Sequence, residues 1–178
     1  MFMNILIWVS GIILGYFFLV FVVLRLVAPF MGFKQNMPVE ELPLEMKLKI
    51  SELEKKSQNQ LSFLQALYGV VQGKALNQWQ HTRFKAAFYL PKLFVNNLAK
   101  IWQTNGFIYC NAINFVGFSM LINSKFFTAK DIKARYVFLN FVVHQYLQVK
   151  VGNNWVDFDP AGSGIRNRPL GTHASFFG

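Results

Sequence analysis

Residues 135–160 read RYVFLNFVVHQYLQVKVGNNWVDFDP, and this stretch decides the fold class. β-branched and aromatic side chains dominate residues 136–139, 141–143 and 147–151, as is typical of strands. Gly152-Asn153-Asn154 is a turn signal, so residues 155–158 are expected to return as a neighbouring strand. This part of the chain is therefore predicted to form a small antiparallel sheet.

The chain before this sheet has helical patterning. The spacing of apolar residues predicts four helices, over residues 44–69, 76–89, 91–103 and 109–122. Pro91 is suited to the first position of the third helix, and Asn123-Ser124 ends the fourth. Helices followed by antiparallel strands predict an α+β domain, and 178 residues leave room for one.

The N-terminal residues differ from that domain in hydropathy. Residues 5–24 carry no charge, and a helix of that length spans roughly 30 Å, the thickness of a bilayer's hydrocarbon core. We expect a transmembrane anchor at 1–28, a juxtamembrane linker at 29–43 and the domain at 44–178. The run is too long for a signal peptide, and no basic residue precedes it. Arg25 and Lys34 follow it, which favours a single-pass membrane protein with a cytoplasmic domain.

The net charge of +10 is spread unevenly, because no acidic residue lies between Glu54 and Asp131. Such a stretch can attract nucleic acid, anionic lipid or an acidic substrate. Its basic residues are scattered and accompany no nucleic-acid-binding motif, so a solvated basic face is the simpler interpretation and nucleic acid is not an expected partner.

Cys110 is the only cysteine and therefore cannot form an intramolecular disulfide. It lies at the predicted start of the helix over 109–122. A helix N-terminus and a neighbouring imidazolium both favour a thiolate, which is the nucleophilic form. His144, on a predicted strand, is the candidate general base, and an aspartate on the next strand would orient its ring. Asp157 and Asp159 share one strand face, so strand geometry alone leaves both open.

Other assignments for these residue types are less favoured. His81 and His173 are rival bases, but the first lies in a helical stretch and the second in an irregular tail. One cysteine and three scattered histidines make a zinc site improbable, and the chain has no glycine-rich phosphate-binding motif. We therefore expect no metal and no cofactor.

The spacing of these residues resembles the transglutaminase-like cysteine enzyme superfamily. The match consists of Gly-Phe-x-x-Cys at 106–110, His-Gln-Tyr-Leu-x-Val from His144 and Trp-Val-x-x-Asp-Pro from Trp155. The last element selects Asp159 as the third member of a Cys-His-Asp triad. Tyr146 stands where tryptophan is usual, and the resemblance makes it a cleft residue. Asn111 and Gln148 depart from the residues common at their positions.

The resemblance implies a papain-like α+β fold, a protein or peptide substrate and an acyl-thioenzyme intermediate. It also implies an oxyanion-hole residue upstream of Cys110, for which Gln103 and Trp102 are candidates. Two functions follow as hypotheses: a membrane-anchored hydrolase or acyltransferase acting on amide bonds, or a catalytically silent domain that binds an anionic partner. The intact triad favours the enzyme, and no oligomeric state is predicted.

Overall fold

The computed structural model describes residues 2–28, 30, 41–79, 91–104, 108–139, 142–162 and 168–175. Helices precede a three-stranded antiparallel sheet, which confirms the predicted α+β class. In chain order the elements are α1 (Phe2–Phe18), η1 (Leu19–Val23), α2 (Leu24–Val27), α3 (Leu44–Lys56), α4 (Gln60–Trp79), α5 (Leu98–Gln103), α6 (Cys110–Ile122), η3 (Ala129–Asp131), β1 (Ile132–Leu139), β2 (Val142–Val151) and β3 (Asn154–Phe158).

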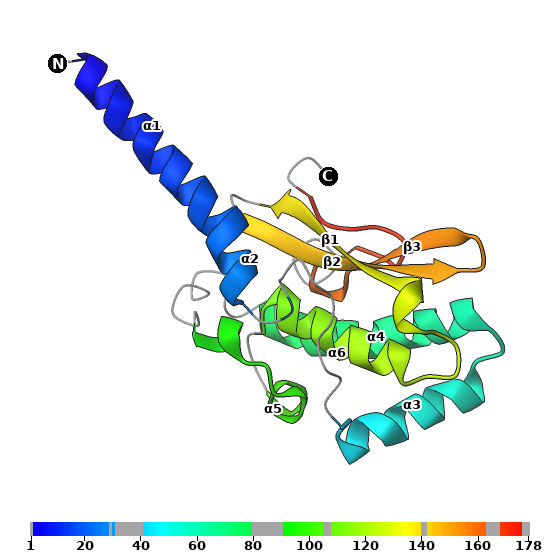
Figure 1. Cartoon of the computed structure of the whole chain (residues 1–178). Helices are drawn as coiled ribbons and strands as arrows, with labels where there is room; N and C mark the ends of the chain where they lie inside the picture. The colour runs from blue at the N-terminus through cyan, green and yellow to red at the C-terminus, as the bar shows by residue number, and fades with distance from the viewer. Residues whose placement is uncertain are drawn as a thin grey trace.

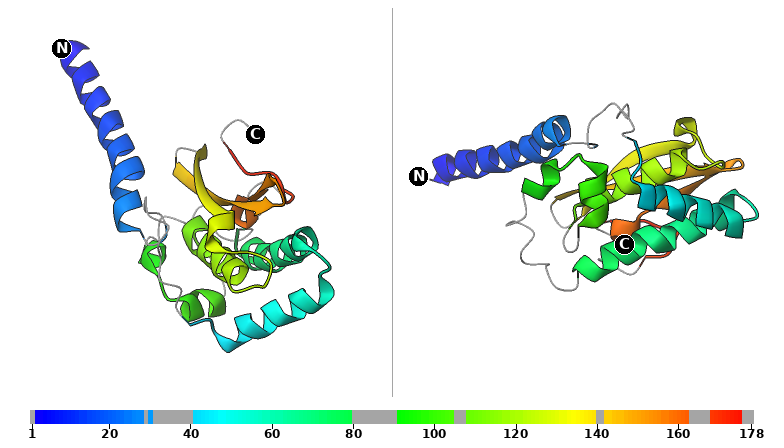
Figure 2. Two further views of the ribbon diagram at one scale, coloured as in Figure 1. Left: turned by 45° about the vertical axis from the view of Figure 1, so that its right-hand side comes forward. Right: turned by 90° about the horizontal axis from the view of Figure 1, so that it is seen from below.

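The N-terminal segments form an arm that extends away from the rest of the molecule (Figures 1 and 2). α1, the π-helical η1 and α2 follow one another directly from Phe2 to Val27. At the base of the arm, Ala28 is buried in a small apolar cluster with Leu93 and Val143. Among the described residues, no single helix has both the length and the apolar character needed to cross a membrane.

The predicted helix over 44–69 is two helices, α3 and α4, and the single-helix prediction is wrong at residues 57–59. Asn59 and Ser62 cap the second helix, because the Ser62 hydroxyl accepts the Asn59 N–H at 3.1 Å and Asn59 Oδ1 accepts the Ser62 N–H at 2.9 Å. Short polar side chains bond the backbone in this way at helix starts. The capping signal outweighs the apolar periodicity that continues across it.

The next two predicted helices are also revised. Of the helix predicted at 76–89, residues 76–79 are the end of α4 and residues 80–90 lie outside the described part of the chain. The helix predicted at 91–103 is a 3₁₀ turn at 91–94 and then α5. α5 begins only after Asn97, whose side chain accepts the Lys100 N–H at 2.8 Å.

α6 is the central helix of the domain and agrees with the helix predicted at 109–122. Every residue from Asn111 to Leu121 is buried, because α6 packs against the sheet as well as against α3, α4 and α5 (Figure 1). Gly117 allows a close approach to the sheet: a Cβ there would lie 2.8 Å from Phe158 Cε1 on β3. Burial of this helix on all sides holds its first residue in a defined place.

The strands lie in the order β1-β2-β3, with β2 in the centre. β2 and β3 are joined by a tight turn, in which Val151 pairs with Asn154 and Gly152 has φ +59°, a value that favours glycine. Leu147 and Val149 of β2 belong to the main hydrophobic core. The opposite face of β2, which carries His144 and Tyr146, is buried as well. The first strand begins at Ile132, four residues before the predicted start.

Candidate functional site

Cys110 is the first residue of α6 and lies at the edge of the core. The preceding residue, Tyr109, has extended backbone (φ −73°, ψ 158°), and its carbonyl accepts the Ile113 N–H at 3.0 Å. The N–H groups of a helix's first turn have no acceptor within the helix, and the helix dipole is positive there. Cys110 is half-buried, whereas the eleven residues that follow it are buried. The thiol is therefore at the positive end of the most buried helix.

His144 and Asp159 form a buried pair. Nε2 of His144 lies 2.9 Å from both carboxylate oxygens of Asp159, and the two side chains are 4% and 0% exposed. Asp159 follows directly on β3, which ends at Phe158 opposite Leu147 of β2. Asp159 also accepts two backbone N–H groups, from Gly162 at 2.8 Å and from Ala174 at 2.9 Å. The carboxylate is thus fixed from three directions.

The Cys110 side chain also lies close enough to the His144 ring to influence its pKa. Because Nε2 contacts Asp159, Nδ1 is the ring nitrogen that remains for the sulfur. Burial is the largest effect on the pKa of His144 and lowers it, but the interactions with Asp159 and with the nearby Cys110 together raise this pKa from 6.5 to about 10. An imidazolium at neutral pH can stabilise a thiolate beside it. Burial and the charge of Cys110 raise the pKa of Tyr109, so that its hydroxyl stays neutral.

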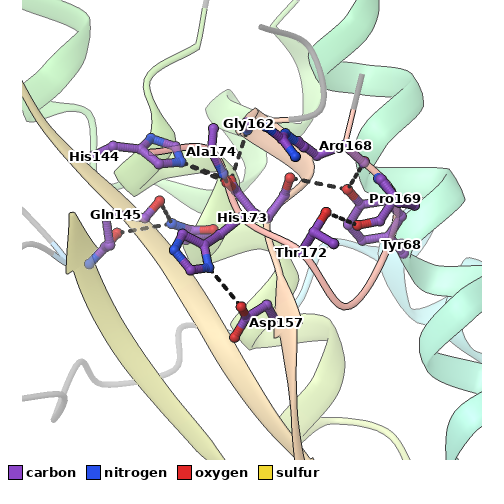
Figure 3. A network of polar contacts seen from close by, with 12 residues as sticks. Tyr68, His144, Gln145, Asp157, Gly162, Arg168, Pro169, Thr172, His173 and Ala174 are labelled. Atoms are coloured by element: carbon purple, nitrogen blue, oxygen red, sulfur yellow. Dashed lines mark hydrogen bonds and ion pairs between the residues drawn. The ribbon is translucent and has the colours of Figure 1, made fainter. Parts of the chain in front are cut away.

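Asp157 belongs to a second histidine–aspartate pair. Its Oδ2 lies 2.7 Å from Nδ1 of His173 (Figure 3), and its Oδ1 accepts the side-chain N–H of Gln148 at 2.8 Å. The two aspartates that strand geometry could not separate therefore contact different histidines. His173 lies in the tail predicted to be irregular, and no local sequence pattern around it signals the contact with Asp157.

Tyr146 lies beneath His173. The two rings are stacked with centroids 4.3 Å apart and planes 6° from parallel, and Tyr146 is 6% exposed. Burial, followed by the charge of Asp157, raises the pKa of the Tyr146 hydroxyl. The tail covers this ring, so the structure places Tyr146 under a protein segment and not at an open cleft.

In the part of the chain that the structure describes, neither predicted oxyanion-hole residue has a hydrogen bond to Cys110, His144 or Asp159. The Trp102 indole N–H donates to Glu45 Oε2 at 3.0 Å, and Lys74 Nζ lies 4.3 Å from the centroid of the Trp102 ring. Gln103 is exposed at the end of α5. The donors that the structure does place at Cys110 are the backbone N–H groups at the start of α6.

A buried amide pair near the site was not anticipated. Asn114, one turn after Cys110, donates through Nδ2 to the backbone carbonyl of Gln145 at 2.7 Å. Gln145 in turn donates through Nε2 to the carbonyl of Phe30 at 2.6 Å. These bonds join α6, β2 and the base of the N-terminal arm beside His144. Buried amides surrounded by apolar residues are the signal that could have found them, because such groups need partners.

The described residues also bear on the predictions about a metal site and about the rival bases. They contain no group of three or more His, Cys, Asp and Glu side chains arranged to hold a metal ion. His81, one of the two rival bases, lies outside them. Comparisons of the chain with protein-family models, curated proteins and solved structures return no match.

Proposed function

We propose that the protein is a cysteine enzyme of the transglutaminase-like, papain-like type that acts on amide bonds. The observation that carries the proposal is the position of His144, whose Nε2 contacts the buried Asp159 carboxylate while the Cys110 side chain lies near enough to raise the pKa of the ring. Nucleophile, base and orienting carboxylate come from a helix start, a central strand and the end of the next strand. This arrangement of roles defines a catalytic triad.

The chemistry follows from these contacts. The Cys110 thiolate attacks the carbonyl carbon of an amide, and the carbonyl π electrons move to oxygen to give an oxyanion. The backbone N–H groups at the start of α6 are suited to receive that charge. His144 then gives its Nδ1 proton to the leaving nitrogen as the C–N bond breaks, which leaves a thioester on Cys110.

The second half-reaction regenerates the enzyme. Water or an amine attacks the thioester carbon, and neutral His144 takes a proton from the attacking group. The C–S bond breaks, and the thiolate and imidazolium form again. Asp159 keeps the ring oriented in both halves. Water as the acceptor makes the protein a hydrolase with protein or peptide substrates, and an amine makes it an acyltransferase.

The alternative is a silent domain of this type that binds an anionic partner through its basic stretch. The enzyme is favoured because the buried contacts of Asp159 orient a histidine at a half-buried thiol. A binding module has no need for that arrangement. A buried carboxylate and imidazole are costly to hold without a role for the charge pair.

Alkylation of Cys110 tests the proposal without knowledge of the substrate. Because the chain has one cysteine, any alkylation of the full-length protein by iodoacetamide reports on Cys110. We expect labelling at pH 6 to be much faster than for a free cysteine, whose pKa of about 8.5 leaves little thiolate there. His144→Ala should reduce the labelling rate at pH 6 to that of a free cysteine. Cys110→Ala, which has no thiol, is the negative control. A pH profile like that of a free cysteine and unchanged in His144→Ala contradicts the proposal.

We further propose that the N-terminal arm anchors the protein in a membrane, with α1, η1 and α2 acting together. Their 26 helical residues extend roughly 39 Å at about 1.5 Å per residue, compared with about 30 Å for the hydrocarbon core. Trp8, Ile12 and Leu14 are among the large apolar side chains exposed along it. The base of the arm packs beside Tyr109 and Val143, the residues just before Cys110 and His144, so the bilayer would lie near the site.

Membrane extraction at alkaline pH tests the anchor. The full-length protein should stay with the membrane, and Leu14→Lys should release it, because a lysine at the centre of a spanning helix costs roughly 2.5–3.5 kcal/mol. Leu48→Lys is the matched control, since Leu48 is similarly exposed but lies on α3. Equal retention of both variants, or release of the unaltered protein, contradicts the anchor.

A further inference from the structure

The orientation of Asp159 depends on a segment that is remote in sequence. The Gly162 N–H reaches Oδ1 from three residues away, in the helical residues 160–162 that directly follow Asp159. The Ala174 N–H reaches Oδ2 from fifteen residues away, in the C-terminal segment 168–175. The first bond is local, whereas the second exists only while that segment lies against the sheet.

His173 attaches the segment beside that bond. Its ring stacks on Tyr146 at 4.3 Å, and its Nδ1 lies 2.7 Å from Asp157 Oδ2. Tyr146 is two residues after His144 on β2, and Asp157 is two residues before Asp159. The two histidine–aspartate pairs are therefore neighbours on one face of the sheet, and Figure 3 shows His173 between Asp157 and Gly162.

The partner of His173 is itself held in place. Gln148 donates to the other oxygen of Asp157 at 2.8 Å, and Arg135 Nε donates to the Gln148 side-chain oxygen at 2.8 Å. The backbone carbonyl of Asp157 accepts the Gly171 N–H at 2.8 Å. This chain of bonds crosses all three strands, so His173 rests on a rigid surface while its own side chain is 30% exposed.

We infer that His173 is a positioning residue of the proposed enzyme: it clamps the C-terminal segment to β2 and β3 so that the Ala174 N–H holds the carboxylate of Asp159 against His144. The inference rests on the proposed function for its catalytic consequence, but not for the clamp itself. His173 would act indirectly: it does not touch the reacting atoms, but it fixes the carboxylate that orients His144. His173 contacts neither Cys110 nor His144 through any bond that the structure describes.

Three substitutions separate the two contacts of His173. His173→Phe keeps an aromatic ring over Tyr146 and loses the bond to Asp157. His173→Ala loses both contacts. His173→Asn can donate to Asp157 from a position close to that of Nδ1 and is the conservative replacement. Thr172→Ala is the matched control, because in the described part of the chain the Thr172 hydroxyl donates to the Pro169 carbonyl alone, at 2.9 Å within the segment's own turn.

Two measurements on the full-length protein test the clamp. Hydrogen exchange at the Ala174 amide should accelerate about tenfold in His173→Ala, the effect of losing roughly one hydrogen bond to a charged group. Cys110 alkylation at pH 6 should slow by about tenfold, the lower end of the range for lost orienting partners. His173→Phe should give intermediate values of the exchange rate and of the alkylation rate. His173→Asn should keep both rates close to those of the unaltered protein, and Thr172→Ala should change neither rate.

The possible results are distinguishable. Unchanged exchange at Ala174 in His173→Ala overturns the clamp whatever the enzyme does. Faster exchange with an unaltered pH profile of alkylation means that His173 only stabilises the tail, which overturns the positioning role. If Cys110 of the unaltered protein reacts like a free cysteine, the proposed function fails. In that event the downfield NMR signal of the His144 Nε2–H still decides the clamp, because it should shift in His173→Ala and stay in place if the clamp is absent.

Discussion

Replacement of Gly162 by alanine is the most direct test of how Asp159 is held. A Cβ at residue 162 would lie 2.6 Å from Asp159 Cγ and 2.9 Å from Ala174 Cβ, and closer still to Asp159 Oδ2. Neither neighbour has room to give way, because Asp159 and Ala174 are both fully buried. The carboxylate must therefore move, and its bonds to His144, Gly162 and Ala174 cannot all survive.

The cost can be estimated from these contacts. Overpacking a well-packed site costs about 1–3 kcal/mol, and loss of one hydrogen bond to a charged group costs about 1.5–3 kcal/mol. Alanine also lowers the conformational entropy of the unfolded chain relative to glycine, and this offsets about 0.4–1 kcal/mol of the destabilisation. We expect Gly162→Ala to lower the free energy of unfolding by roughly 2–5 kcal/mol. Alkylation of Cys110 at pH 6 should slow in the same variant.

The assay is urea unfolding of the full-length protein, followed by its fluorescence, together with the alkylation rate. Gly73→Ala is the matched control, since a Cβ at residue 73 of α4 meets no atom within 4 Å. That substitution should be neutral or should stabilise the protein by about 0.5–1 kcal/mol, because alanine is the better helix former. If Gly162→Ala unfolds at the same urea concentration as Gly73→Ala and keeps the alkylation rate, the close packing around Asp159 is wrong.

Three further predictions concern the triad and the core. Asp159→Asn should slow turnover or acylation by roughly 10²–10⁴-fold, and Asp157→Asn by far less, because only Asp159 contacts His144; the reverse order in a rate measurement reassigns the orienting residue. The pKa of His144 is raised from 6.5 to about 10, so its charge-pair contribution should be complete below pH 6.5 and lost as the pH rises through about 10. The difference in unfolding free energy between the unaltered protein and His144→Ala should shrink over that window, and a difference that grows with pH contradicts the assigned shift. Gly117→Ala should destabilise by about 1–3 kcal/mol, because its Cβ would lie 2.8 Å from Phe158 Cε1; an unchanged unfolding midpoint shows that the ring can move aside.

The sequence by itself determined the fold class and the elements that carry the candidate triad. The strands around residues 136–158 and the helix that starts at Cys110 depend on local signals: β-branched and aromatic runs, a Gly-Asn-Asn turn and apolar residues before a polar stop. Where local signals compete, sequence reasoning failed. The caps at Asn59 and Asn97 start helices where apolar periodicity alone predicted continuous ones.

The family resemblance pointed to Asp159 as the partner of His144, but only the tertiary structure shows that contact and pairs Asp157 with His173. Asp157 and Asp159 share a strand face, and sequence periodicity cannot distinguish two positions two residues apart. What separates them is the C-terminal segment, which brings the Ala174 N–H to Asp159 and the His173 ring to Asp157. Those contacts join residues fifteen and sixteen positions apart, the first through a backbone N–H that nearly every residue has and the second through two side chains. A contact of that kind leaves no pattern along the chain and arises only when the folded core holds both partners in place.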